Sequence, residues 1–368
     1  MAQNELCLND DKTEILILFS PAKPKSLPPY YQSFDIDGNH IMTAKEDCAN
    51  YTEIKTMKNH TTVTEFLIIG FQILPELRVM LFSVFLFIYL IALLGNILLI
   101  VLVCMDHRLH KPMFFLLLNL SAIDICYMSV TVPKLLSTLV TQNKSISVVG
   151  CVLQMYCFMG CLSTEFCLLT AMSYDRFIAI CNPLRYTVIV NNIACIRLVF
   201  ASWLIGFLDT MPHALFAFLS SFCDSNEINH FFCDLTALMK LSCSRTNVIE
   251  MVTYVEGVFL GIGPFLLTFS SYVCIISTIL RINSAEGRRK AFSTCSSHLT
   301  VVMLFYGTTL CMYMRPASVY YMQENKLLAV VYVTVIPVLN PLIYGARNKD
   351  LKRAFEKCLI KKNAVFIE

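Results

Sequence analysis

The amino-acid sequence predicts an all-α membrane protein: a seven-transmembrane helix bundle with a short amphipathic C-terminal helix. Hydrophobic residues make up 56% of the 368 residues and charged residues only 15%, with a mean hydropathy of +0.62. A soluble protein carries about a quarter of its residues as charges. Seven apolar segments are each long enough to cross a hydrocarbon core, which takes about 20 helical residues. Continuous runs of this length indicate helices, because the strands of a membrane barrel alternate in short segments.

The chain is expected to lie in a lipid bilayer, and the distribution of positive charge predicts its orientation there. Sixteen Lys and Arg residues lie in the loops and tail on one side of the predicted spans, and five lie in the loops on the other side. Since cytoplasmic loops carry the positive excess, we expect a cytosolic C-terminus and an extracellular N-terminus. The net charge of +3 is too small to indicate nucleic-acid binding. The predicted spans are 79–103, 113–139, 150–174, 198–219, 250–280, 291–314 and 327–344.

Residues 1–56 differ from the rest of the chain, since they are polar, contain four prolines and lack a helical period. We expect them to form a disordered extracellular extension. Their short apolar run at 15–19 follows acidic residues, whereas a signal peptide has a longer apolar core after positive charge. Three glycosylation sequons lie on the predicted outer side, at Asn50, Asn59 and Asn143.

Four of the seventeen cysteines lie outside the apolar spans on the predicted outer side, at Cys151, Cys223, Cys233 and Cys243. That compartment is oxidising, and four cysteines allow three pairings. The cysteines within the spans are expected to be small buried hydrophobes. His230 together with Cys233 could instead begin a metal site, but two ligands without a third make this the weaker interpretation.

Four sequence strings at the ends of the predicted spans carry a family resemblance. Span three closes with Met-Ser-Tyr-Asp-Arg-Phe-Ile-Ala-Ile-Cys at 172–181, and span six opens with Lys-Ala-Phe-Ser-Thr-Cys-Ser-Ser-His-Leu at 290–299. Span seven ends with Pro-Val-Leu-Asn-Pro-Leu-Ile-Tyr at 337–344, and Leu-His-Lys-Pro-Met-Phe-Phe at 109–115 leads into span two. These strings resemble the odorant receptors, a branch of the rhodopsin-like G-protein-coupled receptors, and the resemblance covers nearly all of residues 57–368.

The resemblance implies a plasma-membrane odorant receptor that binds a small, mostly apolar molecule within its helical bundle. It further implies activation of a heterotrimeric G protein, of the stimulatory kind that raises cAMP. The seven-helix domain is then expected at 57–346, with an amphipathic helix and cytoplasmic tail at 347–368. Met57 resembles the family's usual start, so an upstream start site is the alternative explanation of residues 1–56.

The resemblance also selects one set of disulfide pairings and one glycosylation site on the predicted outer side. It implies one disulfide between Cys151 and Cys233, which pins the second outer loop to span three, and another between Cys223 and Cys243, which closes that loop on itself. It favours Asn59 as the glycosylated sequon, because the family glycosylates its short N-terminal tail.

The odorant is expected among spans three, five and six, at positions that match where ligands sit in similar receptors. Helical spacing places these residues on single helix faces, although such faces can equally be helix–helix core. Glu256 is exceptional, because the sequence offers it no obvious cation, so we expect it to face an aqueous mouth or to favour ligands with a donor or an amine. The predicted ligand-binding residues are Phe158, Met159, Leu162, Ser163, Glu256, Leu260, Tyr306, Thr309, Leu310 and Tyr313.

The resemblance implies a G-protein switch at the cytoplasmic end of span three. Arg176 is expected to pair with the adjacent Asp175 at rest and to swing toward Tyr272 and Tyr344 in the active state. Charges at this depth are costly and tend to mark function.

Two carboxyl groups are expected near the middle of the bundle, from Asp124 in span two and Glu165 in span three. Asn96 and Asn340 can supply amides to them. The four side chains form either a protonated, hydrogen-bonded cluster or, as in related receptors, a sodium site that stabilises the inactive state. No other cofactor is expected.

The segment after Tyr344 predicts an amphipathic helix on the inner membrane surface. Leu351, Phe355, Cys358 and Leu359 recur there at i, i+4, i+7 and i+8 among Lys and Arg residues. Palmitoylation of Cys358 is one interpretation, and a plain interfacial cysteine is the other.

Other function classes fit the sequence less well. An enzyme lacks support, because neither a Gly-rich phosphate loop nor an HExxH pair is present. A transporter would show internal repeats with matching broken helices, and none is apparent. The nearer alternative is a rhodopsin-like receptor outside the nose that responds to an endogenous metabolite.

Overall fold

The computed structural model describes residues 15–18, 31–36, 39–44, 63–71, 74–222, 225–313 and 322–365. The chain separates into two compact units, Met1–Thr61 and Thr62–Glu368.

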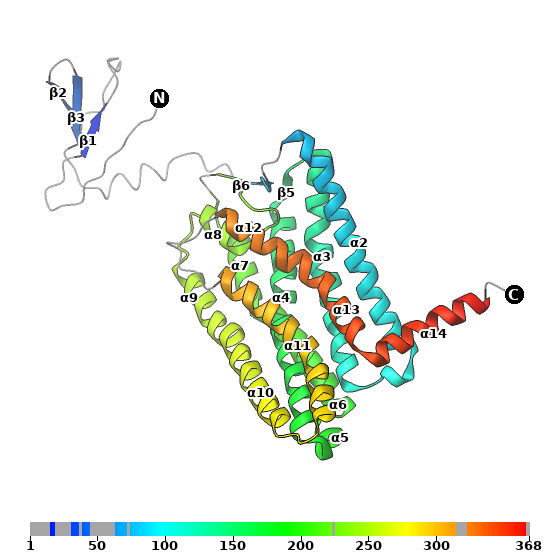
Figure 1. Cartoon of the computed structure of the whole chain (residues 1–368). Coiled ribbons are helices and arrows are strands. Elements are labelled where there is room, and N and C mark those ends of the chain that lie inside the picture. Colours follow the sequence, from blue (N-terminus) through cyan, green and yellow to red (C-terminus); the bar gives the residue numbers. More distant parts are fainter. Residues whose placement is uncertain are drawn as a thin grey trace. The chain divides into compact units, whose positions relative to one another are not determined.

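The first unit contains a three-stranded antiparallel sheet in the order β1-β3-β2 (Figure 1). Its strands are β1 (Ile15–Leu18), β2 (Tyr31–Ile36) and β3 (Asn39–Ala44). Residues 1–56 were expected to be disordered, and over 15–18, 31–36 and 39–44 the structure has strands instead. The sequence between β2 and β3 is Asp-Gly, a dipeptide preferred in two-residue hairpin loops.

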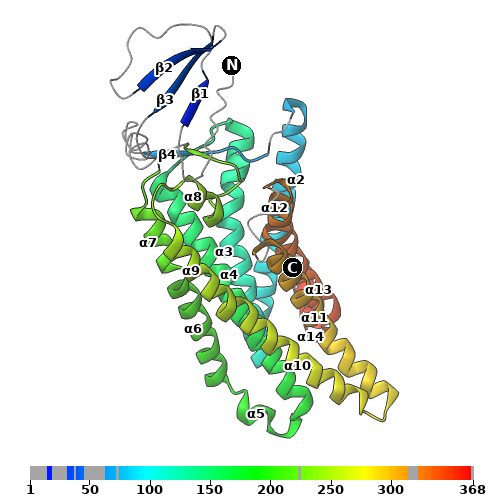
Figure 2. The same cartoon turned by 90° about the vertical axis from the view of Figure 1, so that its left-hand side faces the viewer.

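The second unit is a bundle of long helices that run side by side (Figures 1 and 2). Within the described residues, six helical segments are long and apolar enough to cross a membrane. Several are divided by a break or a π-helical turn. The helices are α2 (Pro75–Met105), α3 (Pro112–Thr141), α4 (Val148–Cys181), α6 (Asn192–Asp209) with α7 (Met211–Leu219), α9 (Asn247–Glu256) with η3 (Gly257–Ile262) and α10 (Gly263–Leu280), α11 (Ala285–Tyr313), and α12 (Met322–Val330) with η5 (Val331–Val335) and α13 (Ile336–Arg347).

The remaining predicted span, 291–314, coincides with most of α11, which packs against α4, α10 and α13. α11 does not reach the apolarity of the other six, because charged residues fill its first turns and Ser, Thr and His recur through residues 293–300. With α11 included, the architecture is the expected seven-helix bundle, followed by α14 (Lys349–Val365), which turns away from the end of α13 (Figure 1).

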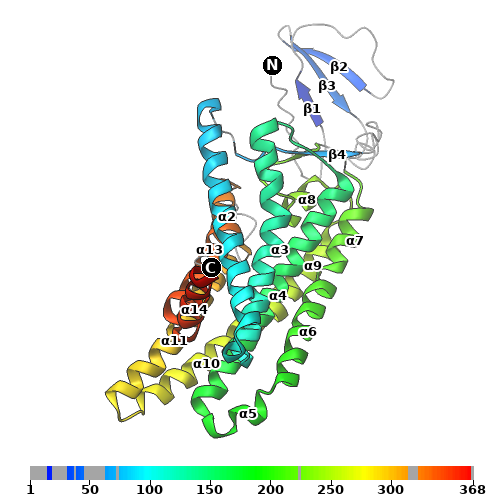
Figure 3. The same cartoon turned by 90° about the vertical axis from the view of Figure 1, so that its right-hand side faces the viewer.

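α4 lies at the centre of the bundle, where it packs against α3, α6, α10 and α11 (Figure 3). More than half of the most apolar stretch of α3 and of α4 is buried, against about a quarter or less in the segments around α2, α6 and α10. α4 and α6 approach each other closely at Gly206, where an added Cβ atom would lie 2.7 Å from the backbone nitrogen of Thr164. Small residues at such crossings let membrane helices pack closely.

Short elements connect the helices at both ends of the bundle. At the end where α2 begins lie the strands β4 (Glu65–Ile68), β5 (Ser145–Ser147) and β6 (Glu227–Ile228) and the helix α8 (Leu235–Leu241). At the opposite end lie η1 (His107–Leu109), η2 (Pro183–Arg185) and α5 (Tyr186–Ile189).

Candidate functional site

A small sheet closes one end of the bundle, and we call it, together with residues 229–234, the lid. β4 pairs antiparallel with β5 and parallel with β6. Phe66 and Ile68 of β4 are buried and Glu65 is exposed, which is the alternation of a strand with one face on the core. The lid thus joins the segment before α2 to the α3–α4 and α7–α9 connections.

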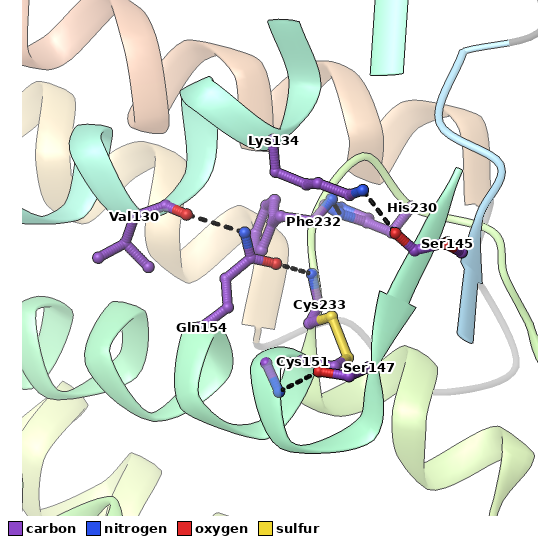
Figure 4. Close-up of a disulfide and its surroundings, with 10 residues drawn as sticks. Val130, Lys134, Ser145, Ser147, Cys151, Gln154, His230, Phe232 and Cys233 are labelled. Carbon is purple, nitrogen blue, oxygen red and sulfur yellow. Dashed lines mark hydrogen bonds between the residues drawn. A yellow bond between two sulfur atoms is a disulfide. The ribbon is translucent and has the colours of Figure 1, made fainter. Parts of the chain in front are cut away.

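A disulfide between Cys151 and Cys233 attaches the lid to the first turns of α4 (Figure 4). This is the pairing that the resemblance implied. Gln154, almost one turn further along α4, reinforces it: its Oε1 accepts the backbone N–H of Cys233 at 2.9 Å, and its Nε2 donates to the carbonyl of Val130 in α3 at 2.8 Å (Figure 4). Gln154 therefore bonds the lid to two helices, and sequence reasoning did not single it out.

Only one of the two cysteines of the second predicted disulfide belongs to the described residues. Cys243 is disulfide-bonded, and Cys223 lies outside the described residues. The flanking backbones come together, since Phe222 and Ser242 form an antiparallel bridge and the N–H of Cys243 donates to the carbonyl of Ser221 at 2.9 Å.

Lys326 fastens the lid to the seventh helix. Its ammonium group donates to the carbonyl of Gly70 at 2.7 Å and to Oδ1 of Asn229 at 2.6 Å. Gly70 has a φ of +62°, a conformation that glycine adopts without steric cost. The chain can therefore turn after β4 and present this carbonyl to the lysine.

His230 is buried within the lid, where its ring stacks on Phe231 and meets Phe232 edge-on. The pKa of His230 is lowered to about 4, chiefly because the ring is buried; the charge of Asp234 opposes this shift and that of Lys326 adds to it. The ring is therefore neutral at physiological pH, and its Nδ1 accepts the N–H of Phe232.

Phe232 links the lid to the predicted ligand-binding face of α4. Its ring centroid lies 4.7 Å from that of Phe158, which also contacts the rings of Tyr127 and Tyr332. Aromatic side chains from α3, α4, η5 and the lid thus meet beneath the disulfide. Phe158 is buried, whereas Met159, Leu162 and Ser163 on the same helix are partly exposed.

The predicted ligand-binding residues of α11 do not take part in the aromatic contact between the lid and α4. Tyr306 is buried against Phe166 and Phe265, and its hydroxyl lies 3.5 Å from that of Thr170. The Thr309 hydroxyl donates to the carbonyl of Phe305 within its own helix, at 2.7 Å. Leu310, like Leu260 of η3, is partly exposed. Tyr313 ends α11, and its side chain lies outside the described part of the chain.

Glu256 has a partner that the sequence analysis did not find. Nε2 of His213, in α7, lies 3.2 Å from Oε2 of Glu256 and 3.0 Å from the hydroxyl of Thr253. Ser163 also has an acidic partner, because it donates to Asp209 at 3.0 Å. Asp209 and His213 are four residues apart in an otherwise apolar span, and that spacing of ionisable residues in a membrane helix was the signal available.

A cavity of about 500 Å³ lies between β4 and the neighbouring ends of α2 and α3. Its wall is mixed: most of the lining residues are apolar, Thr138 and Gln142 are polar, and Arg78 and Lys144 are charged. The predicted ligand-binding residues do not line it, so it is separate from the face described above. The other described lining residues are Ile68, Ile69, Gly70, Phe71, Leu74, Pro75, Leu135, Leu139 and Phe231.

The predicted polar group in the middle of the bundle is assembled from α2, α3, α4 and α13. Asn96, Asp124, Glu165 and Asn340 are all buried, and Asn340 donates to Oδ2 of Asp124 at 2.9 Å. Among the described residues, Oδ1 of Asn96, Oδ1 of Asn340 and both oxygens of Glu165 have no hydrogen-bond partner. Such a group of oxygens suits either protonated carboxyls or a hard cation such as sodium.

At the end of the bundle opposite the lid, Arg176 is paired with Asp175. Its Nε donates to Oδ2 of Asp175 at 2.9 Å, and both side chains are buried. Tyr186 of α5, which sequence reasoning missed, donates to Oδ1 of the same carboxylate at 2.7 Å. Burial, together with the negative charge of Asp175, raises the pKa of Tyr186, so it stays a neutral donor.

Among the described residues, the other two predicted switch residues, Tyr272 and Tyr344, form no hydrogen bond with Asp175 or Arg176. The Tyr272 hydroxyl lies 2.6 Å from Nδ1 of His298 in α11. The Tyr344 hydroxyl is buried and, among the described residues, has no hydrogen-bond partner. The structure therefore has the Asp175–Arg176 arrangement expected at rest, with Tyr272 held by another partner.

Comparison with known proteins decides the family. A family profile described as olfactory receptor matches residues 85–362. Olfactory receptor 5I1 of Homo sapiens is 48% identical over 307 residues, which cover 83% of this chain and 98% of that receptor. The chain belongs to the olfactory receptor family. Olfactory receptor-like protein OLF1 of Canis lupus familiaris is 47% identical over 82% of this chain and 97% of its own length, and olfactory receptor 5AR1 of Mus musculus is 45% identical over 83% and 98%.

Family membership, together with the apolar helices, makes this chain a multi-pass plasma-membrane receptor of the G-protein-coupled class and not an enzyme. It confirms the family that the sequence strings indicated. The sequons at Asn50 and Asn59 lie outside the described residues, so glycosylation at Asn59 stays a prediction.

The C-terminal helix of the receptor docks on the end of the bundle that carries Arg176. Leu351 is buried, Phe355 and Cys358 are exposed, and the side chain of Leu359 lies outside the described part. Asp350 pairs with Lys111, in the connection between α2 and α3, at 2.7 Å. α14 therefore has the amphipathic pattern expected of a helix on a membrane surface.

Proposed function

We propose that this olfactory receptor binds a small, mostly apolar odorant beneath the lid and couples to a stimulatory G protein, so that binding raises cAMP. The observation that carries the proposal is the attachment of the lid over the ligand-binding face. Disulfide Cys151–Cys233 and the Gln154 bridge hold Phe232 against Phe158. A fixed lid keeps water away from an apolar ligand and defines the depth of its site.

The proposed ligand-binding surface is formed by the partly exposed side chains below that aromatic contact. Met159 and Leu162 of α4 and Leu260 of η3 supply apolar surface, and Ser163 supplies a hydroxyl that is already oriented by Asp209. Small-molecule sites usually combine such apolar walls with few polar groups. Tyr306 lies one turn below Thr309 and Leu310, where it can respond to ligand through its contacts with Phe166 and Phe265.

The mechanism is a shift in the populations of two states. At rest the positive charge of Arg176 is neutralised by Asp175, which is itself held by Tyr186. In the active state Arg176 leaves that carboxylate for Tyr272 and Tyr344, and the freed surface admits the G protein. The odorant favours the active state only by its difference in affinity for the two states.

The lid end of the receptor faces the outside of the cell, and the end that carries Arg176 and α14 faces the cytosol. The excess of Lys and Arg on the α14 side supports this orientation. The disulfide supports it as well, since such bonds persist in the oxidising extracellular compartment.

We further propose that a sodium ion binds among Asn96, Asp124, Glu165 and Asn340 in the resting receptor. The buried oxygens without hydrogen-bond partners support this site. The ion would supply positive charge to two carboxyls that are otherwise expensive in lipid. Exchange of sodium for choline should raise basal signalling, and the substitution Asp124→Asn should remove that sodium dependence.

The function is tested with an odorant panel in cells that express the receptor together with trafficking chaperones, by measuring cAMP. We expect at least one odorant to raise cAMP in a dose-dependent way. Responses only to endogenous metabolites would favour a receptor outside the nose. Substrate flux in cells without G protein would favour a transporter and refute the proposal.

A further inference from the structure

A polar cluster lies between the helices of the receptor near its lid half, and it is built from α4, the α6–α7 break and α9. The cluster consists of Ser163, Asp209, His213, Thr253 and Glu256. Hydrogen bonds organise it in two parts, Ser163 with Asp209 at 3.0 Å and His213 with Thr253 at 3.0 Å. Glu256 joins the second part through its 3.2 Å contact with His213. Side chains from three segments therefore converge inside an apolar bundle.

The helices are interrupted where the two acids stand. Asp209 is the last residue of α6, and α7 restarts two residues later with Pro212 in its first turn. Glu256 is the last residue of α9, and the π-helical turn η3 follows directly. Interruptions of this kind leave backbone groups unpaired and are frequent at functional sites. The two interruptions each follow an acid of the same cluster, which favours a functional site over ordinary helix packing.

The cluster contains two acidic side chains that flank one histidine. Glu256 contacts His213 at 3.2 Å, and Asp209 precedes His213 by four residues. Neither acid is paired with a Lys or Arg side chain among the described residues. The side chain of His213 is fully buried. Each acid also keeps one carboxyl oxygen without a protein partner in the described part of the chain, Oδ1 of Asp209 and Oε1 of Glu256. Ionised together, two carboxylates repel each other, and a bound cation favours the ionised form of both.

We propose that Asp209 and Glu256 together bind the protonated amino group of a small amphipathic amine. The inference rests on the proposed odorant site and names the class of ligand that it selects. An ammonium group carries up to three donors, enough for both free carboxyl oxygens. The apolar part of the amine lies along Met159, Leu162 and Leu260, which are partly exposed beside the acids. A metal ion fits less well, because the described residues contain no group of three His, Cys, Asp or Glu side chains arranged to hold one.

The ligand class is tested by direct binding to the purified full-length receptor in detergent, without a G protein. The probes are straight-chain amines of four to ten carbons, each compared at pH 7 with the alcohol and the carboxylic acid of equal length. Ligand-induced stabilisation is read from thermal unfolding with a thiol-reactive dye, which reports the exposure of buried free cysteines such as Cys161 and Cys195. We expect amines to bind about 10- to 100-fold more tightly than the matched alcohols, the effect of a charge-assisted hydrogen bond.

Three variants test whether Asp209 and Glu256 are responsible for the preference for amines. Asp209→Asn and Glu256→Gln should each weaken amine binding about 10-fold or more and leave alcohol binding within about threefold. Glu250→Gln is the matched control, since this exposed acid lies on the same helix and bonds only to Thr246, and it should change neither. Should Asp209→Asn fail to fold, Ser163→Ala replaces it, because the loss of this donor misorients the same carboxylate.

The possible outcomes separate the inference from the proposed function. Equal binding of amines and alcohols at every chain length overturns it, and so does an amine preference that survives both acid substitutions. Amine binding that depends on the two acids, without any rise in cAMP, supports the inference and refutes the coupling. A cAMP response to odorants with no amine preference supports the coupling and refutes the inference.

Discussion

The substitution Gly206→Ala tests whether the contact between α4 and α6 holds the centre of the bundle together. The added Cβ atom would lie 2.7 Å from the backbone nitrogen of Thr164 and 2.8 Å from the carbonyl oxygen of Gly160, and it would also collide with the Thr164 hydroxyl. Ordinary contact begins at 3.4 Å, so the two helices must separate by about 0.7 Å (3.4 minus 2.7). Backbone atoms cannot move aside as a flexible side chain can.

The expected cost is about 1–3 kcal/mol, the range for overpacking of a well-packed core. A loss of this size lowers the melting temperature by roughly 2–12 °C, if the scaling for soluble chains of 150–250 residues holds. The assay is thermal unfolding of the purified receptor, with surface expression in cells as a second measurement.

Gly307→Ala is the matched control, because a Cβ atom added there meets nothing within 4 Å. It is also a Gly→Ala change within a long membrane helix, and it should be neutral or stabilising by up to about 1 kcal/mol. If the melting temperature of Gly206→Ala equals that of the wild-type receptor or of this control, α4 and α6 do not pack closely at Gly206.

Three further predictions concern the lid and the switch. Cys151→Ser or Cys233→Ser should each abolish surface expression or odorant response, since the loss of a native disulfide costs about 2–5 kcal/mol; full activity in both variants would contradict the pairing. Asp175→Asn should raise basal cAMP, and Arg176→Ala should uncouple odorant from cAMP, so a normal dose–response curve in the latter would refute the switch. Burial lowers the pKa of His230 to about 4 in the folded lid. Between about pH 6.5 and 4, His230 is therefore protonated in the unfolded protein but neutral in the folded one. Stability should therefore fall as pH drops from about 6.5 towards 4, by about 2 kcal/mol at pH 5, and His230→Gln should remove this dependence in pH-dependent melting.

The sequence located the parts of the receptor that depend on lipid. A span must be apolar and long enough to cross the hydrocarbon core, so composition alone placed six of the seven helices close to their observed bounds. α11 was also predicted as an apolar span, at 291–314, although Ser, Thr and His recur in its first half. The Asp175–Arg176 pair was predictable for a different reason: the two residues are adjacent, and a charge at that depth needs its counter-ion nearby.

The hairpin at residues 31–44 shows a limit of composition. The segment is polar overall, which predicts disorder, yet its Asp-Gly dipeptide lies between two runs able to pair as strands.

The tertiary structure decided which polar side chains meet across helices. Glu256 received no partner from the sequence, but the structure places His213 beside it from 43 positions earlier in the chain. Lys326 likewise reaches Gly70 across 256 positions. Helical periodicity determines which residues share a face of one helix, but it does not determine how that helix is rotated against its neighbours. That rotation depends on interhelical packing such as the contact at Gly206, and it brings His213 of α7 against Glu256 of α9.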